Sequence, residues 1–401
     1  MRALLRILPV LFFFATQAAA QPARGVGGCD AQTGACSAAA PAPPPSLAAA
    51  PADLAALLRA AQAFRERRDF ARAVAEVDAA IRLRPGSAPA HHLRGLILAE
   101  RSELETAVWA LDAALKIEPN NIDMLRDRGM TQYRRREFLF ALEDFARVEP
   151  KRPDDIEIVA ARGDMFVRMG DWDRAIAELT RELRMRPGSW LAVARRAEAW
   201  RGKGRLDVAL NEYGLATRMA PGYWPARHAR AEILESRGEL AAALAEYDAV
   251  LRAQPRHAPT LALRCGARLR LDRVGGAAAD CEAALDVAPD NQVVLVWQGL
   301  IDYRLGAFER ARASFDAAVE QHGAWPRANL ARAHLRETLG DEAGAFRDRR
   351  DAQRYTESDA EWRQIQSELT PFRRGPWCAD PAPCGTLPAG RVASSGCGCG
   401  P

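Results

Sequence analysis

The sequence predicts an all-α fold, a solenoid of about nine helical hairpins stacked side by side. Two periodic features carry this prediction. Prolines recur every 34 residues from Pro85 to Pro289, and alanines keep a 34-residue phase of their own from Ala73 to Ala345. Within each unit, apolar residues follow three- and four-residue steps, which is the spacing of one helix face. A hairpin this short cannot bury its apolar side alone, so neighbouring units must cover it.

The unit over residues 156–189 shows the pattern most completely. The apolar side of its first helix consists of Ile158, Val159, Phe166 and Met169. Gly170 and Asp171 then end that helix and start the next, because glycine accepts positive φ and aspartate caps a helix N-terminus. The second helix carries apolar or small residues at helical steps, namely Ala175, Ile176, Leu179 and Leu183. It is expected to stop before Pro187.

Other positions keep the same phase along the chain. Four residues after each periodic alanine stand mostly large residues: Val77, Leu111, Phe145, Leu179, Tyr213, Tyr247, Cys281 and Phe315. Early in the first helix stand small residues: Ala61, Gly95, Gly129, Gly163, Ala197, Ala231, Gly299 and Ala333. The turn is marked by Gly170, Gly204, Gly238, Gly306 and Gly340.

This pattern resembles that of the tetratricopeptide repeat family, whose 34-residue unit has a small residue in helix A, alanine and then an aromatic in helix B, and a closing proline. The resemblance covers residues 54–359 as nine units. It implies a right-handed superhelix in which small residues let helix A approach helix B and large ones fill the gap to the next repeat. Enlarging Ala175 or Ala209 is expected to cost about 1–3 kcal/mol.

The formal charge is +4, and acidic and basic residues are interspersed through every repeat. This is the composition of a solvated surface, so a nucleic-acid-binding function is not expected.

Residues 1–20 predict a secretory signal peptide. Arg2 and Arg6 precede an apolar run, and small residues follow, with cleavage expected after Ala20. The run is too short for a membrane span.

Residues 21–53 are rich in Ala, Pro and Gly and predict a disordered linker. Within it, Cys29 and Cys36 allow two interpretations, a disulfide bridge or lipidation at Cys29.

Two internal departures from the pattern are informative. Pro150 precedes the in-phase Pro153 by three residues, so the second helix of the third repeat should end early, either as a local irregularity or as a bend. In the seventh repeat, Cys265 and Cys281 occupy positions that face each other in an antiparallel helix pair. A disulfide between them is expected after export, with two small core residues as the alternative.

After the ninth repeat, Ser358 and Glu361 form a capping box, which opens a helix that we assign to residues 360–370. Its apolar side carries Trp362, Ile365 and Leu369, and it is expected to cover the exposed face of the last repeat. Residues 371–401 are a Cys-, Pro- and Gly-rich tail. Its cysteines are candidates for disulfides, for a thiolate metal site or for reactive thiols: Cys378, Cys384, Cys397 and Cys399.

The motifs of common enzymes are missing. The sequence has no Gly-rich phosphate loop after a strand, no GxSxG elbow and no HExxH. His228, Glu232 and Glu235 share one helix face near Glu198, but a hydrated groove wall is the simpler interpretation. The sequence therefore predicts no catalytic residue, no metal site and no cofactor.

In tetratricopeptide repeat proteins, helix A lines a concave groove that receives partner segments. The resemblance places these residues in the groove: Arg126, Met130, Tyr133, Arg134, Asp164, Arg168, Glu198, Arg201, His228, Glu232, Glu235, Leu269, Arg270, Leu300, Tyr303 and Arg304. The Lys/Asn pairing of carboxylate-clamp receptors is absent from these positions. A basic and aromatic section meets an acidic one, which suits a partner with an acidic segment followed by a basic one. The alternative is that these basic residues only solvate the helices.

Three function classes follow. The first is a non-enzymatic protein–protein interaction scaffold of the bacterial cell envelope, with a protein or peptide partner and without a transmembrane segment in the mature chain. The second is a metal- or thiol-redox-handling protein that uses its Cys-rich tail. The third is an adaptor that regulates an envelope enzyme. The protein is expected to be exported, with the periplasm as its location and secretion or a lipid anchor as alternatives.

Overall fold

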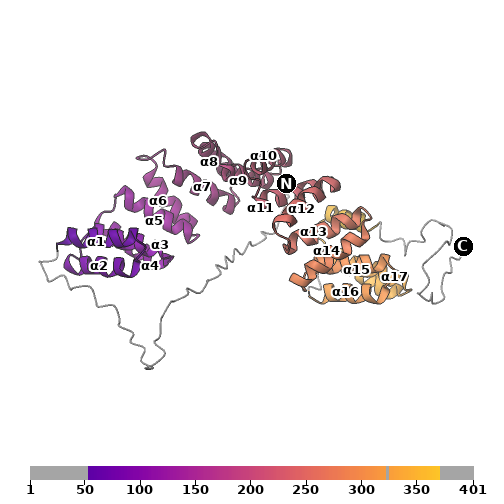
Figure 1. Cartoon of the computed structure of the whole chain (residues 1–401). Coiled ribbons are helices and arrows are strands. Elements are labelled where there is room, and N and C mark those ends of the chain that lie inside the picture. The colour runs from indigo at the N-terminus through magenta and orange to yellow at the C-terminus, as the bar shows by residue number, and fades with distance from the viewer. Residues whose placement is uncertain (1–52, 322–324, 371–401) are drawn as a thin grey trace, which may run out of the picture.

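A computed structural model describes residues 53–321 and 325–370. In these residues the chain forms 19 helices and no strand (Figure 1). Their bounds are α1 Leu54–Glu66, α2 Phe70–Leu83, α3 Ala88–Glu100, α4 Leu104–Ile117, α5 Ile122–Arg134, α6 Phe138–Val148, α7 Ile156–Met169, α8 Trp172–Met185, α9 Trp190–Gly202, α10 Leu206–Met219, α11 Trp224–Ser236, α12 Leu240–Ala253, α13 Ala258–Arg270, α14 Val274–Val287, α15 Gln292–Arg304, α16 Phe308–Gln321, α17 Pro326–Thr338, α18 Glu342–Arg354 and α19 Asp359–Leu369.

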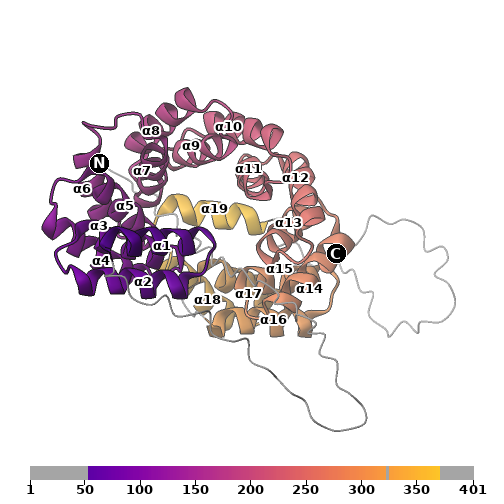
Figure 2. The same ribbon diagram turned by 60° about the vertical axis from the view of Figure 1, so that its left-hand side comes forward.

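Helices α1 to α18 form nine antiparallel pairs, in each of which an odd-numbered helix A packs on the following even-numbered helix B. The pairs stack in sequence order, which confirms the predicted solenoid. Viewed as in Figure 2, the stack curves so that the odd-numbered helices line its concave side and the even-numbered helices its outer side. The predicted signal peptide, the linker apart from Asp53 and the Cys-rich tail, with Cys29, Cys36, Cys378, Cys384, Cys397 and Cys399, lie outside the described residues.

The contacts between small and large residues hold each pair together. Phe145 packs so closely on Gly129 that a Cβ atom there would lie 2.7 Å from its ring. Leu179 packs in the same way on Gly163, where the corresponding distance is 2.8 Å. The periodic alanines of helix B are almost completely buried, as the close-packing interpretation requires.

The turns within the pairs share one backbone conformation. Gly170, Gly204, Gly238, Gly306 and Gly340 all have positive φ, as expected at a helix end that requires the left-handed region. At the other four turns, non-glycine residues in the same 34-residue phase adopt it as well: Arg68, Ser102, Arg136 and Asp272. Tertiary packing therefore imposes this conformation where the local sequence does not favour it.

The junction between the third and fourth pairs is the irregular one. Helix α6 has 11 residues, whereas α4 and α8 have 14, so it ends early as Pro150 predicts. Because its last turn is missing, α6 contacts α7 less than any other B helix contacts the A helix that follows it. Glu149 compensates in part, since it accepts hydrogen bonds from Arg162 and Arg181 on the next pair.

The apolar core is divided unequally along the array. From α12 to α19 one cluster runs without interruption from Leu251 to Leu369. Six smaller clusters lie between α1 and α13. Cys265 and Cys281 face each other inside the long cluster, joined by a disulfide in the slot that other repeats fill with a small and a large residue.

Helix α19 contacts the last repeat through its A helix, on the concave side of the array. Each helix A of the array packs against the helix B before it, so a helix that covered the end of the stack would pack on α18. Instead, α19 contacts α17 more than any other helix. Figure 2 shows it on the concave side of the curved stack, facing α11 and α13. Its apolar side chains Ile365 and Leu369 are buried there against the apolar cluster of the last repeats.

Candidate interaction groove

The candidate groove is the concave surface of the odd-numbered helices, where the sequence places its partner-binding residues. Most of these side chains bond to the neighbouring repeat. The sequence separations of such bonds are 29 to 35 residues, about one repeat, as in Arg126–Asp155, Arg201–Glu232 and Arg270–Glu235. The groove is therefore a network that spans repeats. Its polar groups are held in place before any partner binds, which reduces the entropy lost on binding.

Asp164 on α7 is the centre of the basic section. Its carboxylate is buried and accepts a hydrogen bond from the Tyr133 hydroxyl of α5 at 2.6 Å and one from Arg168 at 2.7 Å. Arg195 of α9 forms an ion pair with it at 3.1 Å. Burial and the nearby Asp164 charge raise the pKa of Tyr133 to about 12, so this hydroxyl stays protonated and donates at neutral pH. One carboxylate thus links three A helices.

Arg126 and Arg134 join adjacent repeats as well. Arg126 donates to Asp155 at 2.6 Å and also pairs with Glu157, both at the start of α7. Arg134 reaches back to the carbonyl oxygen of Ala99 at 2.8 Å and keeps an exposed side chain. Met130 beside them is half-buried against the apolar cluster of this region.

The acidic section lies on α11. Glu232 accepts from Arg201 at 2.7 Å and lies 3.5 Å from the ring of His228. Burial alone would raise the pKa of Glu232, but His228 and Arg201 outweigh it and hold the pKa below its usual value. Glu235 accepts from the Tyr247 hydroxyl at 2.6 Å and pairs with Arg270 of α13 at 3.1 Å. Glu232 and Glu235 are therefore each paired with an arginine of an adjacent repeat.

Tyr303 differs from the prediction. Its side chain is 2% exposed and its hydroxyl bonds to the Thr338 hydroxyl at 2.6 Å, so it supports α15 from within instead of presenting a ring to a partner. Arg304 pairs with Asp272 at 2.9 Å. The described part of this groove therefore offers fewer aromatic side chains than the sequence predicts.

The histidine cluster next to the acidic section is a hydrogen-bonded group. The imidazoles of His228 and His257 each lie 2.8 Å from the Thr260 hydroxyl, between α11 and α13. Burial and the neighbouring His228 lower the pKa of His257 to about 4. Within residues 53–321 and 325–370, no group of three or more His, Cys, Asp or Glu side chains is placed to hold a metal ion.

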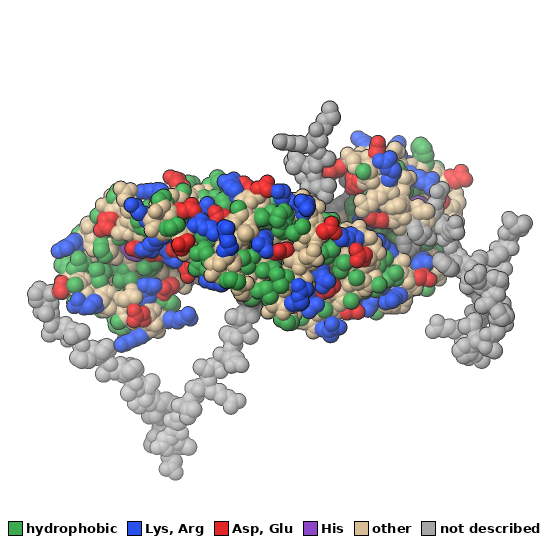
Figure 3. All heavy atoms as spheres, turned by 90° about the horizontal axis from the view of Figure 1, so that it is seen from above, with side chains coloured by type: hydrophobic (Ala, Val, Ile, Leu, Met, Phe, Trp, Pro, Cys, Tyr) green, Lys and Arg blue, Asp and Glu red, His purple; other side chains and the backbone are tan. Residues whose placement is uncertain are grey.

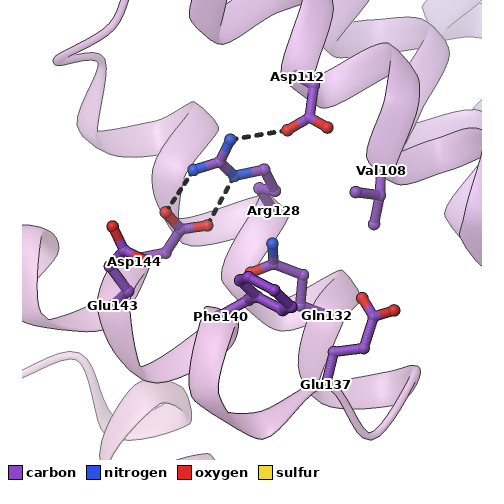
Figure 4. Close-up of a pocket in the computed structure, with 8 residues that line it drawn as sticks. All are labelled: Val108, Asp112, Arg128, Gln132, Glu137, Phe140, Glu143 and Asp144. Carbon is purple, nitrogen blue, oxygen red and sulfur yellow. Dashed lines mark hydrogen bonds and ion pairs between the residues drawn. The ribbon is translucent and has the colours of Figure 1, made fainter.

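A second periodic network was not predicted from the sequence. Arginines recur in helix A at 34-residue steps, with a gap at Gln298: Arg94, Arg128, Arg162, Arg196, Arg230, Arg264 and Arg332. Arg128 shows the arrangement in Figure 4, where it donates to Asp144, 16 residues later, and to Asp112, 16 residues earlier. It therefore joins the B helices of two successive repeats and lines a hollow of about 270 Å³ with Phe140. The 34-residue spacing of these arginines was the signal available in the sequence.

The charges between these networks are mixed in sign. Figure 3 shows Lys and Arg side chains interspersed with Asp and Glu over the face in view. In the described ranges no helix combines the length and the apolarity that crossing a membrane would require.

Comparison with known proteins identifies the repeats. A family model described as tetratricopeptide repeat matches residues 58–122, 160–224 and 267–329. The chain is a tetratricopeptide repeat protein. The pairs outside the matched stretches pack in the same way as those inside them. Tetratricopeptide repeats are in general scaffolds for protein–protein interaction, and proteins of this kind are typically non-enzymatic.

Several solved structures are similar to this chain at low sequence identity. The C-terminal part of a repeat protein of this family from Cytophaga hutchinsonii is 12% identical, with a TM-score of 0.50; the alignment covers 60% of this chain and 98% of that one. A tetratricopeptide repeat protein from Parabacteroides merdae is 21% identical over 60% of this chain and 95% of that one, with a TM-score of 0.46. PilF of Pseudomonas aeruginosa is 17% identical over 54% of this chain and 99% of that one, with a TM-score of 0.45. No curated protein matches the sequence.

Proposed function

We propose that this protein is an exported, non-enzymatic scaffold of the bacterial cell envelope that binds a partner segment in the concave groove of its third to sixth repeats. One observation carries the proposal. The concave helices α5 to α11 present a basic section, held by Asp164, directly beside an acidic section around Glu232 and Glu235. Such a surface recognises an extended or helical segment with the opposite order of charges.

The arginines in this surface keep the capacity to bind a partner. Arg168 bonds to Asp164 through Nε, and its side chain is 45% exposed, so the rest of its guanidinium faces solvent. Arg134 is exposed as well. A carboxylate of a partner can therefore reach both without breaking the bonds between repeats.

The export part of the proposal rests on residues 1–20 and is consistent with the Cys265–Cys281 disulfide, because such bonds persist in oxidising compartments. Fusing residues 1–53 to a reporter enzyme that folds only after export tests it. Reporter activity supports export, and removal of Arg2 and Arg6 together with the apolar run should abolish it. An inactive but stable fusion would contradict the proposal.

The groove part is tested by chemical cross-linking and pull-down from the envelope fraction. The groove variant is Arg134→Glu/Arg168→Glu, and the matched control is Arg72→Glu/Arg174→Glu, since Arg72 and Arg174 are exposed arginines of B helices. Circular dichroism verifies that both variants fold. Loss of a partner from the groove variant alone supports the proposal. An unchanged set of partners in the groove variant would refute the assignment of the groove.

A further inference from the structure

Helix α19 covers the concave side of the last repeats but does not fill it. A hollow of about 200 Å³ lies there, lined by A helices and by α19 itself. Its lining residues are Glu235 of α11, Leu263 and Arg270 of α13, Val293 and Trp297 of α15, Arg327 of α17 and Glu368 of α19. Every helix of the array that contributes is an A helix, so α19 occupies the surface that this fold offers to partners.

The contacts of α19 are those of a bound amphipathic helix. Trp362, Ile365 and Leu369 follow each other at three- and four-residue steps and face the apolar cluster of the last repeats, with Ile365 and Leu369 buried. Glu368 beside them pairs with Arg327 of α17 at 2.6 Å. An apolar stripe and one anchoring carboxylate therefore hold the helix in place.

The fit is incomplete. The hollow remains between the C-terminal part of α19 and the groove floor of Leu263, Val293 and Trp297. Burial raises the pKa of Glu235, and the nearby Glu368 charge acts in the same direction, so two carboxylates lie close together at this point. A helix with a larger apolar residue over the hollow would bury more apolar surface than α19 does.

Helix α19 is also attached to the array only by a short exposed connection and by few buried side chains. Only residues 355–358 connect it to α18, and Tyr355, Glu357 and Ser358 are exposed. The outer face of the helix carries exposed polar side chains such as Arg363 and Gln366. A short helix with few buried side chains opens at lower free energy than the paired helices of the array.

We propose that the concave groove of repeats six to nine is a binding site for an amphipathic helix of a partner protein, and that α19 is its built-in competitor. This rests on the proposed function only in that the concave side binds partners. The partner helix carries an apolar stripe like Trp362, Ile365 and Leu369 and a carboxylate at the position of Glu368, which Arg327 binds. Binding requires α19 to leave, so α19 lowers the apparent affinity for every such partner.

The test uses the full-length chain and a fluorescein-labelled peptide of residues 357–370 as the probe, with fluorescence anisotropy as the readout. In the opened variant Ile365→Asp/Leu369→Asp, α19 can no longer dock. We expect this variant to bind the peptide about tenfold more tightly than the wild type does. The matched control Gln366→Asp/Ser367→Asp changes the exposed side of α19 and should bind as weakly as the wild type.

Two further measurements test the recognition itself. Arg327→Glu, introduced into the opened variant, should weaken binding about tenfold, and a peptide with Glu368→Lys should restore it. In the wild type, an excess of unlabelled peptide should accelerate amide hydrogen exchange in α19 alone, which needs no altered protein. If the opened variant and the wild type bind the peptide equally, or neither binds it, the proposal is overturned. The pull-down on the Arg134/Arg168 surface is independent of this result.

Discussion

The first six repeats and the last three bury their apolar residues in different ways. From the end of α12 through the last three repeats, one apolar cluster runs from Leu251 to Leu369 and encloses the Cys265–Cys281 disulfide. Six separate clusters lie between α1 and α13, and the α6–α7 junction is bridged by the ion pairs of Glu149. The stability of a solenoid is approximately a sum of repeat and interface terms. We therefore expect the C-terminal part to unfold as one unit and the N-terminal part to open locally.

The two parts also differ in what covers the groove. Over α11 to α17 the groove is occupied by α19, with Glu368 bound to Arg327. Over α5 to α9 its polar side chains bond to one another across repeats, around Asp164. A partner can approach the second surface directly, whereas it must compete for the first.

The largest effect is expected from truncating equivalent buried aromatics. Phe315 and Phe145 occupy the same repeat position, and both are fully buried. Replacing either by alanine should lower the free energy of unfolding by about 3–5 kcal/mol. In Phe315→Ala, hydrogen exchange should accelerate from α12 to α19, whereas in Phe145→Ala it should accelerate only around α4 to α7. An equally wide spread in both variants would contradict the division into two parts.

The Cys265–Cys281 disulfide provides a second test of the difference between the two parts. Its two cysteines are 16 residues apart, so opening it should cost about 3 kcal/mol of stability in the last three repeats. Thermal unfolding of the oxidised protein, with and without a thiol reductant, measures this loss. The variant Cys265→Ala/Cys281→Ala is the control and should not respond to reductant. A wild-type protein that is equally insensitive to reductant would show that the bond contributes nothing.

The stability of the α6–α7 junction should depend on the charge of Glu149. Glu149→Gln removes the carboxylate that Arg162 and Arg181 share, and we expect a loss of about 1–2 kcal/mol. Hydrogen bonds from Arg181 and Arg162 also lower the pKa of Glu149, so its contribution is present at neutral pH and disappears as pH falls through that lowered value.

Hydrogen exchange of α7 is the measurement for this junction, in low and in high salt. Glu143→Gln, on the exposed side of α6, serves as the control and should leave α7 unchanged. If high salt loosened α7 no more than it loosens α13, the ionic account of the junction would fail.

The smallest effect on stability is expected from protonation of His257. This residue lies where the separate apolar clusters meet the continuous one. Burial and His228 lower the pKa of His257 from 6.5 to about 4. The unfolded chain then binds more protons between these values, so stability falls as pH drops from 6.5 to 4. With solvent screening of this half-buried ring we expect about 1 kcal/mol.

Urea unfolding at several pH values measures this dependence. His257→Gln keeps a hydrogen-bonding side chain and should flatten the dependence between pH 6.5 and 4. His228 and Glu232 face the same cluster, and a dependence that survives in His257→Gln would refute its assignment to His257.

Much of the fold followed from local residues. The 34-residue phase, the glycine turns, the early end of α6 at Pro150 and the facing positions of Cys265 and Cys281 were all predicted, because each depends on helix propensity, turn chemistry or spacing. The sequence assigned the groove residues to the A helices, but it did not predict how their side chains bond to one another. Which carboxylate joins Tyr133 to Arg195, for instance, depends on the distance between repeats.

The sequence by itself determined the repeat, its length and the face that each helix buries, since these properties arise within one or two turns of chain. The tertiary structure alone decided three features. It imposed positive φ at Arg68 and Ser102, it buried Tyr303, and it laid α19 on the concave side of the array instead of over its end. The physical reason is shared: each depends on how helices pack against one another, which is decided by contacts beyond the local sequence.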